Sequence, residues 1–271
     1  MLVKKSFLKW VGSKARIVEQ LLPLLPSGKR FVEPCIGSGT VFLNVNYDSY
    51  ILSDLNPDLI NTFCWVRDDL AGIYNATYAL FTSEIDYYSI RREYNLEKDR
   101  FSLMNAARFI YLNRHCFNGV YRCNKKGDFN VPKGSYNSVF FPKDALINFS
   151  NKLNETRSII YNCNFKQAIN NTCEGDVIYC DPPYITETGS SFCGYTKDKF
   201  SQIDTKELID HLYEAVKRGA KAIVSSSDNK LTRELFCFFQ IHDVRAFRSI
   251  NPNGNRYHAK EFIAVLTPDM I

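Results

Sequence analysis

Residues 177–184 read VIYCDPPY, an apolar run that stops on an acid, two prolines and an aromatic ring. The β-branched and aromatic character of residues 177–180 predicts a buried strand. Two consecutive prolines can continue neither a strand ladder nor a helix, so the strand must end at Asp181. An acid at the tip of a strand is either a plain strand cap or part of a built site, and the rest of the chain distinguishes the two.

Similar short runs recur along the chain and alternate with helical patterns. The clearest helix covers residues 205–218, where apolar residues follow helical spacing and Gly219 stands where a helix-ending glycine belongs. Strands that alternate with helices predict an α/β fold with a parallel, doubly wound sheet and helices on both faces. The predicted strands cover residues 31–34, 50–54, 158–162, 176–180, 222–226 and 261–266.

The length of 271 residues suits one α/β domain with a sizeable insertion, or two smaller domains. No apolar run approaches the roughly 20 residues of a membrane span, and we therefore expect a soluble, cytoplasmic protein. The nine cysteines form no CxxC pair, which argues against a zinc site or a disulfide framework. The four histidines show no metal-like spacing either, so we expect no metal site.

Residues 56–144 interrupt the alternation of strands and helices. Helical periodicity around residues 101–112 gives way to a polar, turn-rich stretch, and no second strand–helix repeat follows within the segment. We therefore interpret residues 56–144 as an inserted, mainly helical domain. Residues 1–55 and 145–271 then form one discontinuous sheet domain.

The net charge of +5 is unevenly distributed. Between Arg91 and Lys133, ten lysines and arginines stand against four acidic residues, an excess of six. A solvated helical face is one interpretation of this segment. Aromatic and amide side chains interleaved with the charges favour a nucleic-acid surface, which needs base-contacting groups as well as groups that neutralise phosphates.

Candidate ligand-binding residues follow the first two predicted strands. Glu33 ends the first strand, Gly37 and Gly39 lie in the turn before a helix, and Asp54 ends the second strand. An acid in the position of Asp54 can accept hydrogen bonds from ribose hydroxyls. A nicotinamide nucleotide is the usual ligand of such a turn, but this turn lacks the third glycine of GxGxxG and follows an acid that would repel a pyrophosphate.

S-adenosylmethionine suits the turn better, because it has an adenosine, a carboxylate and an ammonium but no phosphate. Lys14 could bind its carboxylate while the acid of the first strand binds its ammonium. The alternative for Lys14 is an ordinary surface lysine.

Methylation of an exocyclic amine would explain why each of the residues 181–184 follows the strand at 177–180. The N6 lone pair of adenine is delocalised into the ring, so the amine reacts poorly until acceptors hold both of its hydrogens. Asp181 can accept one hydrogen and the carbonyl of Pro182 the other, with Pro183 helping to fix the direction of that carbonyl. Tyr184 offers a ring face to an extruded base. Catalysis would then depend on positioning and require no metal.

Five blocks of the sequence resemble, in the same order, the Dam family of DNA adenine-N6 methyltransferases from enteric bacteria and their phages. The resemblance runs from about residue 6 to about residue 266. It implies a Rossmann-like, S-adenosylmethionine-dependent methyltransferase sheet with an inserted, mainly helical target-recognition domain. The blocks are FLKWVGSK (7–14), FVEPCIGSGTVFLN (31–44), ILSDLNPDLI (51–60), YLNRHCFNGVYRCNKKGDFNVPKGSY (111–136) and VIYCDPPY (177–184).

The resemblance also implies site residues and a partner. The partner is double-stranded DNA containing GATC, with no membrane and no obligate protein partner. The residues implied for the cofactor are Trp10, Lys14, Glu33, Pro34, Cys35, Gly37, Gly39, Asp54 and Asp181. The residues implied for DNA are Lys9, Phe117, Val120, Arg122, Asn124, Pro132 and Tyr136.

The chemistry of these DNA residues agrees with such a role. Arg122 can bond to guanine through two nitrogens, and Val120 and Pro132 can pack on a thymine methyl group. Phe117 can wedge into the gap that a flipped adenine leaves. Dam proteins usually have tyrosine in place of Phe117 and leucine in place of Val120. The phenylalanine retains a stacking ring, whereas the shorter valine would loosen discrimination at the thymine.

A basic loop near the C-terminus is a further candidate for DNA contact. It contains Arg248, Arg256 and Lys260, with Arg245 just upstream, and these cations could bind phosphates across the duplex. A solvated hairpin is the alternative for this segment.

Other functions compete with methylation of adenine in DNA. They are methylation of another exocyclic amine, in RNA adenine or DNA N4-cytosine, and a non-catalytic, DNA-binding relic of the fold. Pro34 and Cys35 also match the nucleophile dipeptide of cytosine-C5 methyltransferases, although they lie in the predicted cofactor turn. The same enzyme would serve mismatch repair, replication control, anti-restriction or a restriction–modification system, so the sequence predicts the chemistry and leaves the biological role open.

Overall fold

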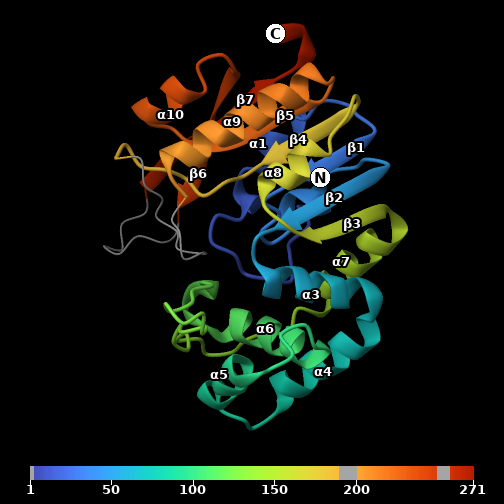
Figure 1. Cartoon of the computed structure of the whole chain (residues 1–271). Coiled ribbons are helices and arrows are strands. Elements are labelled where there is room, and N and C mark those ends of the chain that lie inside the picture. The colour runs from blue at the N-terminus through green and yellow to red at the C-terminus, as the bar shows by residue number, and fades with distance from the viewer. Residues whose placement is uncertain (1–2, 189–199, 249–256) are drawn as a thin grey trace.

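The computed structural model describes residues 3–188, 200–248 and 257–271, without the side chains of residues 246–248 and 257–259. Within these residues the chain builds a mixed α/β fold around one sheet (Figure 1). The strands lie across the sheet in the order β3-β2-β1-β4-β5-β7-β6. Their bounds are β1 Arg30–Glu33, β2 Ser49–Asp54, β3 Arg157–Asn162, β4 Asp176–Cys180, β5 Lys221–Ser227, β6 Gln240–Arg248 and β7 Tyr257–Leu266.

The strand order reverses at β1. The chain passes from β1 to β2 and β3 on one side, then crosses to β4 on the other side, and both neighbours run parallel to β1. Phe31 of β1 thus lies between Tyr50 of β2 and Val177 of β4. In a doubly wound sheet, a ligand binds beyond the carboxyl ends of the strands at such a reversal.

All six predicted strands are present, and β4 ends immediately before Asp181 as predicted. The predicted parallel arrangement holds for β1 to β5 and is wrong at one edge. β7 runs antiparallel to both β5 and β6, and β6 was not predicted. The sequence of β6, QIHDVRAFR, has polar residues between its apolar ones, and the strand lies at the edge of the sheet, where such a sequence is tolerated.

Alternate residues of the central strands supply two hydrophobic clusters. In β4, Val177 and Tyr179 belong to one cluster, whereas Ile178 and Cys180 belong to the other. All four side chains are fully buried. A continuous apolar run on a parallel strand is expected when both faces of the sheet are covered.

Helices cover both faces (Figure 1). Helices α3 and α7 pack on the first cluster, and α8 and α9 pack on the second. The α-helices are α1 Val18–Leu21, α2 Thr40–Asn44, α3 Pro57–Asp68, α4 Leu70–Thr82, α5 Tyr87–Leu96, α6 Leu103–His115, α7 Lys143–Glu155, α8 Phe165–Asn170, α9 Gln202–Lys217 and α10 Lys230–Leu235. The short 3₁₀ helices are η1 Lys14–Arg16, η2 Leu22–Leu24, η3 Phe117–Gly119 and η4 Pro268–Met270.

The helix predicted over residues 205–218 is confirmed as α9. Its N-terminus is closed by a capping box, in which Ser201 and Asp204 each bond to the backbone N–H of the other. Its C-terminus is followed by Gly219 at a φ of 91°, a left-handed conformation that favours glycine. The periodicity around residues 101–112 corresponds to α6, which Ser102 caps.

Helices α3 to α6 form the part of the structure drawn below the sheet in Figure 1. Their buried side chains, such as Phe63 of α3, Ile90 of α5 and Ile110 of α6, belong to the same cluster as Phe31 and Tyr179 of the sheet. Residues 56–144 are therefore packed on the sheet through a continuous core. The division of the chain at residues 55 and 145 stays a prediction.

In the described part of the chain, no helix combines the length and apolarity that crossing a membrane requires.

We expect Gly39→Ala to lower the free energy of unfolding by about 2–4 kcal/mol, through backbone strain and overpacking. Gly39 has a φ of 70°, and a Cβ atom there would lie 2.6 Å from the Phe149 ring. Gly12→Ala is the control, because Gly12 has a φ of 83° but no heavy atom within 4 Å of the added Cβ. This control should cost only about 1–2 kcal/mol. Urea unfolding measures both changes, and equal losses would contradict the packing argument.

Candidate functional site

The acids predicted at the strand ends meet at the reversal of the sheet. Glu33 ends β1, Asp54 ends β2 and Asp181 follows β4, and these three strands are neighbours that run in the same direction. Their carboxyl ends therefore open on the same edge. Burial raises the pKa of all three acids, and the charge of Asp181 adds to the rise for Glu33, whose pKa lies well above its usual range.

Asp181 has one paired and one unpaired carboxylate oxygen. Its Oδ2 lies 2.7 Å from Lys14 Nζ in an ion pair whose lysine is only 6% exposed. Its Oδ1 is buried and has no hydrogen-bond partner among the described residues. A buried acceptor without a donor costs about 1–3 kcal/mol. This oxygen is therefore the strongest sign that the site receives a hydrogen-bond donor from a ligand.

Burial raises the pKa of Asp181 from the ordinary value of 3.8 to about 6, although Lys14 opposes the rise. Near neutral pH the group is therefore a carboxylate and can only accept hydrogen bonds. The interpretation of Lys14 as a surface lysine is wrong, because the side chain is buried and also donates to the carbonyl of Gly12 at 2.9 Å.

Tyr184 is held from two sides. Its hydroxyl donates to Glu261 Oε2 of β7 at 2.9 Å, and Lys14 Nζ lies 4.8 Å from its ring centroid. Pro182 is buried, while Pro183 and Tyr184 are half-buried. The turn after β4 therefore keeps the ring beside the Lys14–Asp181 pair.

Glu33 accepts a hydrogen bond from the first turn of helix α2. Its Oε2 accepts from the backbone N–H of Phe42 at 3.1 Å, and the side chain is 2% exposed. Lys152 lies behind it on α7, over the rings of Phe42 and Tyr50. Burial lowers the pKa of Lys152 to about 8. Binding of an ammonium by Glu33 stays a prediction.

The glycine turn is tied to the tip of β2. Gly37 N–H donates to Asp54 Oδ2 at 3.0 Å, and Asn56 N–H donates to Asp54 Oδ1 at 3.0 Å. Gly37 has a φ of 49°, and a Cβ atom there would lie 3.1 Å from the Trp10 ring. The turn therefore requires glycine both for its conformation and for the close approach of Trp10.

Pro34 and Cys35 lie in this turn, between β1 and Gly37. Burial, followed by the nearby Cys180, raises the pKa of the Cys35 thiol well above its usual range. A thiol that keeps its proton is a poor nucleophile, which argues against the cytosine-C5 interpretation. The described residues include no group of three His, Cys, Asp or Glu side chains placed to hold a metal ion.

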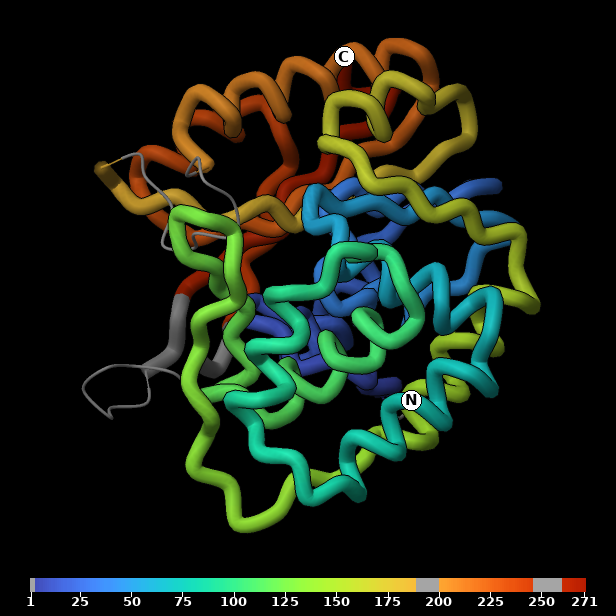
Figure 2. Tube along the Cα trace, turned by 60° about the horizontal axis from the view of Figure 1, so that its bottom comes forward, coloured from blue at the N-terminus to red at the C-terminus, as the bar shows by residue number. Residues whose placement is uncertain are grey.

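Apart from Lys9, the residues implied by the resemblance for DNA contact lie on the segment 116–136, which we call the recognition loop. It lies at the periphery of the molecule (Figure 2). Two isolated bridges, Cys116 to Lys133 and Cys123 to Phe129, close it into a hairpin-like structure. Phe117 and Pro132 are exposed, Val120 is half-buried, and Phe117 N–H donates to the carbonyl of Pro132 at 2.9 Å.

Lys9 and Tyr136 pack on each other at the base of the recognition loop. Lys9 Nζ lies 3.9 Å from the Tyr136 ring centroid and donates to the carbonyl of Arg114. The Tyr136 hydroxyl donates to the carbonyl of Cys116 at 3.0 Å. Both side chains thus hold the loop in place, and their contact with DNA stays a prediction.

Arg122 and Asn124 differ in how their side chains are engaged. Arg122 is exposed, and its Nε donates to Asn130 Oδ1 at 2.9 Å, a bond that uses neither terminal nitrogen. Asn124 caps the turn at the tip of the loop, because its Oδ1 accepts from the N–H groups of Lys126 and Asp128. Asn124 has a structural role in this turn, which the sequence interpretation did not include.

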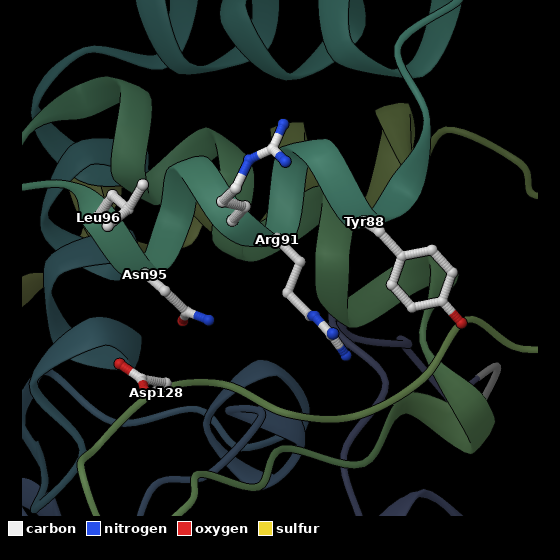
Figure 3. A pocket seen from close by; sticks show the side chains of 6 residues that line it. Tyr88, Arg91, Asn95, Leu96 and Asp128 are labelled. Carbon is white, nitrogen blue, oxygen red and sulfur yellow. The ribbon is translucent and has the colours of Figure 1, made fainter.

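The basic excess between Arg91 and Lys133 is partly neutralised inside the protein. Arg100 pairs with Asp58, and Arg108 pairs with Glu93 and Glu97. A shallow cavity of about 270 Å³ lies between helix α5 and Asp128 of the recognition loop. Figure 3 shows the side chains of Arg91 and Asn95 pointing from α5 toward the part of the recognition loop that carries Asp128. The residues that line the cavity are Tyr88, Arg91, Arg92, Asn95, Leu96 and Asp128.

The side chain of Arg248 lies outside the described residues, as do those of Arg256 and the loop between β6 and β7. Arg245 and Lys260 are exposed on β6 and β7, and they stand opposite each other in the register of this hairpin. Phosphate contact by this segment stays a prediction.

A buried acid that was not predicted, Asp58, lies in the first turn of α3. Its Oδ2 accepts from the hydroxyls of Tyr94 and Tyr121 at 2.7 and 2.8 Å and from Arg100 Nη2 at 2.7 Å. Arg100 Nε also donates to Oδ1 at 3.1 Å. We call these four residues the Asp58 cluster. The acid at a helix start was visible in the sequence, but its tyrosine partners lie 36 and 63 residues further along the chain.

Comparison with known proteins identifies a family for this geometry. Residues 10–250 match the sequence model of the D12 class N6 adenine-specific DNA methyltransferases. The retron Ec67 DNA adenine methylase of Escherichia coli is 38% identical over 264 residues, covering 96% of this chain and 90% of the relative. The DNA adenine methylase of Vibrio cholerae is 35% identical over 274 residues, covering 98% of each protein. That of E. coli K12 is 33% identical over 273 residues, covering 98% of this chain and 97% of the relative.

We expect the carboxyl of Asp181 to titrate near pH 6, and Lys14→Met to raise this pKa further, since the lysine charge and hydrogen bond lower it. Because the folded value exceeds 3.8, the charged form costs folding free energy above about pH 6, and this cost disappears as the pH falls below 3.8. Carboxyl carbon NMR measures the titration. Lys152→Met is the control and should leave Asp181 unchanged; an unchanged pKa in Lys14→Met would contradict the ion pair.

Proposed function

This chain belongs to the D12 class of N6 adenine-specific DNA methyltransferases, and on that premise we propose that it methylates GATC. The proposed reaction moves a methyl group from S-adenosylmethionine to N6 of an adenine that is flipped out of duplex DNA. The observation that carries the proposal is the buried Oδ1 of Asp181 at the reversal of the sheet, which has no hydrogen-bond partner within residues 3–188, 200–248 and 257–271. The N–H group of an amine could donate the hydrogen bond that Asp181 Oδ1 does not receive from the described residues.

The charges at the strand ends fit this cofactor. Three acids, Glu33, Asp54 and Asp181, meet at the ends of neighbouring strands, and the buried Lys14 pairs with Asp181, so the site favours a ligand with positive charge and disfavours a pyrophosphate. When bound, S-adenosylmethionine supplies an activated methyl group on a sulfonium. In the proposal, Asp54 accepts from the ribose hydroxyls and the turn from Glu33 to Gly39 lines the amino-acid part, with Trp10 packed against the turn at Gly37.

Asp181 acts in this proposal as a fixed acceptor. Its Oδ2 is held by Lys14, which orients the carboxylate, and its Oδ1 is left for one hydrogen of the target amine. The carbonyl of Pro182 accepts the other hydrogen, and the second proline restricts the direction of that carbonyl. Holding both hydrogens draws the nitrogen toward tetrahedral geometry and frees its lone pair for attack.

Tyr184 provides the surface on which the flipped base stacks. The bond from its hydroxyl to Glu261 prevents the ring from rotating away, so little side-chain freedom remains to be lost when a base binds. Base flipping costs a few kcal/mol, and stacking on a fixed ring offsets part of that cost.

The recognition loop supplies the contacts for sequence reading in this proposal. Its exposed Arg122 is steadied through Nε by Asn130, which leaves the planar end of the guanidinium to face the N7 and O6 atoms of guanine. Phe117 is 53% exposed and can fill the space that the extruded adenine leaves. Val120 and Pro132 then pack on the thymine methyl group. Because the substrate is cellular DNA, the proposal places the enzyme in the cytoplasm.

We expect the purified chain to transfer labelled methyl groups from S-adenosylmethionine to a GATC duplex, and Asp181→Ala to abolish the transfer. The rate should fall below about pH 6, because protonation of Asp181 removes the acceptor. Asp144→Ala, which changes an exposed acid at the start of α7, is the control and should keep the wild-type rate. Equal methylation of a scrambled duplex would refute GATC specificity, and methylation of cytosine would refute the adenine target.

Arg122→Ala should reduce the preference for GATC over a duplex altered at one guanine by about 1–3 kcal/mol, because a bidentate contact to that base is lost. Lys133→Ala is the matched control, since Lys133 is an exposed cation of the same loop. It should weaken binding to both duplexes alike and reduce the dependence on salt. Competition assays at fixed salt measure the preference, and a uniform loss in Arg122→Ala would contradict base reading.

A further inference from the structure

The turn at Gly37 and the recognition loop are connected through two aromatic rings. The Trp10 ring packs on Gly37, where an added Cβ atom would lie 3.1 Å from the ring. The same Trp10 ring stacks on Tyr121 of the recognition loop, with ring centroids 6.0 Å apart and an angle of 19° between the rings. A ligand at this turn would therefore lie beside a ring that also contacts Tyr121.

A second connection runs through hydrogen bonds and ends on the same tyrosine. Gly37 N–H donates to Asp54, and the other oxygen of Asp54 accepts from Asn56 N–H. Asn56 Oδ1 in turn accepts from the N–H of Asp58, whose carboxylate accepts from the Tyr121 hydroxyl at 2.8 Å. Both connections are short, contiguous and composed of buried or half-buried groups.

We propose that Tyr121 is a positioning residue through which an adenosyl ligand at the Gly37 turn and duplex DNA at the recognition loop strengthen each other's binding. The inference rests on the proposed function and adds a residue and a coupling to it. Tyr121 is suited to this role because it directly precedes Arg122 and follows Val120, so a shift of its ring moves the backbone that carries both base-reading side chains.

The Asp58 cluster contains a natural control. Tyr94 and Tyr121 donate to the same oxygen of Asp58 at 2.7 and 2.8 Å, and both are nearly buried, with 6% and 8% exposure. Tyr94 belongs to α5, whereas Tyr121 belongs to the recognition loop. Both rings pack on Phe129, and among the ring contacts of the described residues Tyr121 also packs on Trp10, which Tyr94 does not. A purely structural role would make Tyr94→Phe and Tyr121→Phe equivalent.

The test measures the affinity for a GATC duplex with and without saturating S-adenosylhomocysteine. In the wild type, the cofactor product should strengthen duplex binding about fivefold or more, as is common for coupled sites. Tyr121→Phe should reduce this factor below about twofold, because the ring loses its bond to Asp58 and its orientation against Trp10. Tyr94→Phe should keep the wild-type factor. Thermal melting first shows the temperature at which both variants are folded, and binding is measured below it.

A reciprocal measurement checks the same coupling without DNA-binding assays. Trp10 and Trp65 are the two tryptophans of the chain, so Trp65→Phe leaves the emission of Trp10 as a reporter beside the Gly37 turn. The duplex should lower the concentration of S-adenosylhomocysteine at half-saturation by the same factor, because coupling between two ligands is symmetric. Adding Tyr121→Phe to this background should remove the shift, and adding Tyr94→Phe should not.

The outcomes separate the two proposals. Equal factors in Tyr94→Phe and Tyr121→Phe, or a wild-type factor of one in a chain that methylates GATC, would overturn the coupling alone. A wild type that binds neither S-adenosylhomocysteine nor the duplex would overturn the proposed function and the coupling with it.

Discussion

The free-energy cost of burying a carboxylate is the constraint on which this structure depends. Asp58 and Asp181 both leave water, and an ionised group does so only when donors or cations compensate for its lost hydration. Asp58 is saturated by two tyrosines and one arginine, and it joins α3, α5 and the recognition loop. Asp181 is half saturated, with Lys14 on one oxygen and no described partner on the other. Because its partners are complete, Asp58 holds three parts of the fold together. Because its partners are incomplete, Asp181 is suited to bind a ligand.

The sheet brings these two centres into one framework. Its reversal at β1 gathers the tips of β1, β2 and β4, and the turn at Gly37 closes over them. The tip of β2 leads within a few residues to the cap of α3 and to Asp58. The helices of residues 56–144 share the core of the sheet, so the recognition loop is supported by a rigid base. The recognition loop and the site at the strand ends are therefore joined through one core, although their residues come from distant parts of the chain.

Much of the site could be predicted because it follows locally from the strands. Glu33, Asp54 and Asp181 each end a strand whose apolar run is plain in the sequence, and parallel strands bring such ends together. Lys14 was harder to interpret, because a lysine in a loop gives no local sign of burial; only the partner at Asp181 explains it. β6 was missed for a related reason, since its sequence QIHDVRAFR has no continuous apolar run and the strand is defined by its pairing with β7.

By itself, the sequence determined the alternation of strands and helices, the strand tip at VIYCDPPY, the glycine turn and the family to which the chain belongs. These are local features, because backbone preference and hydrophobic period act over a few residues. Only the tertiary structure decided which oxygen of Asp181 pairs with Lys14, that Asn124 caps a turn, and that Asp58 joins Tyr94, Arg100 and Tyr121. Those outcomes depend on contacts between residues far apart in the chain, whose distances no local preference specifies.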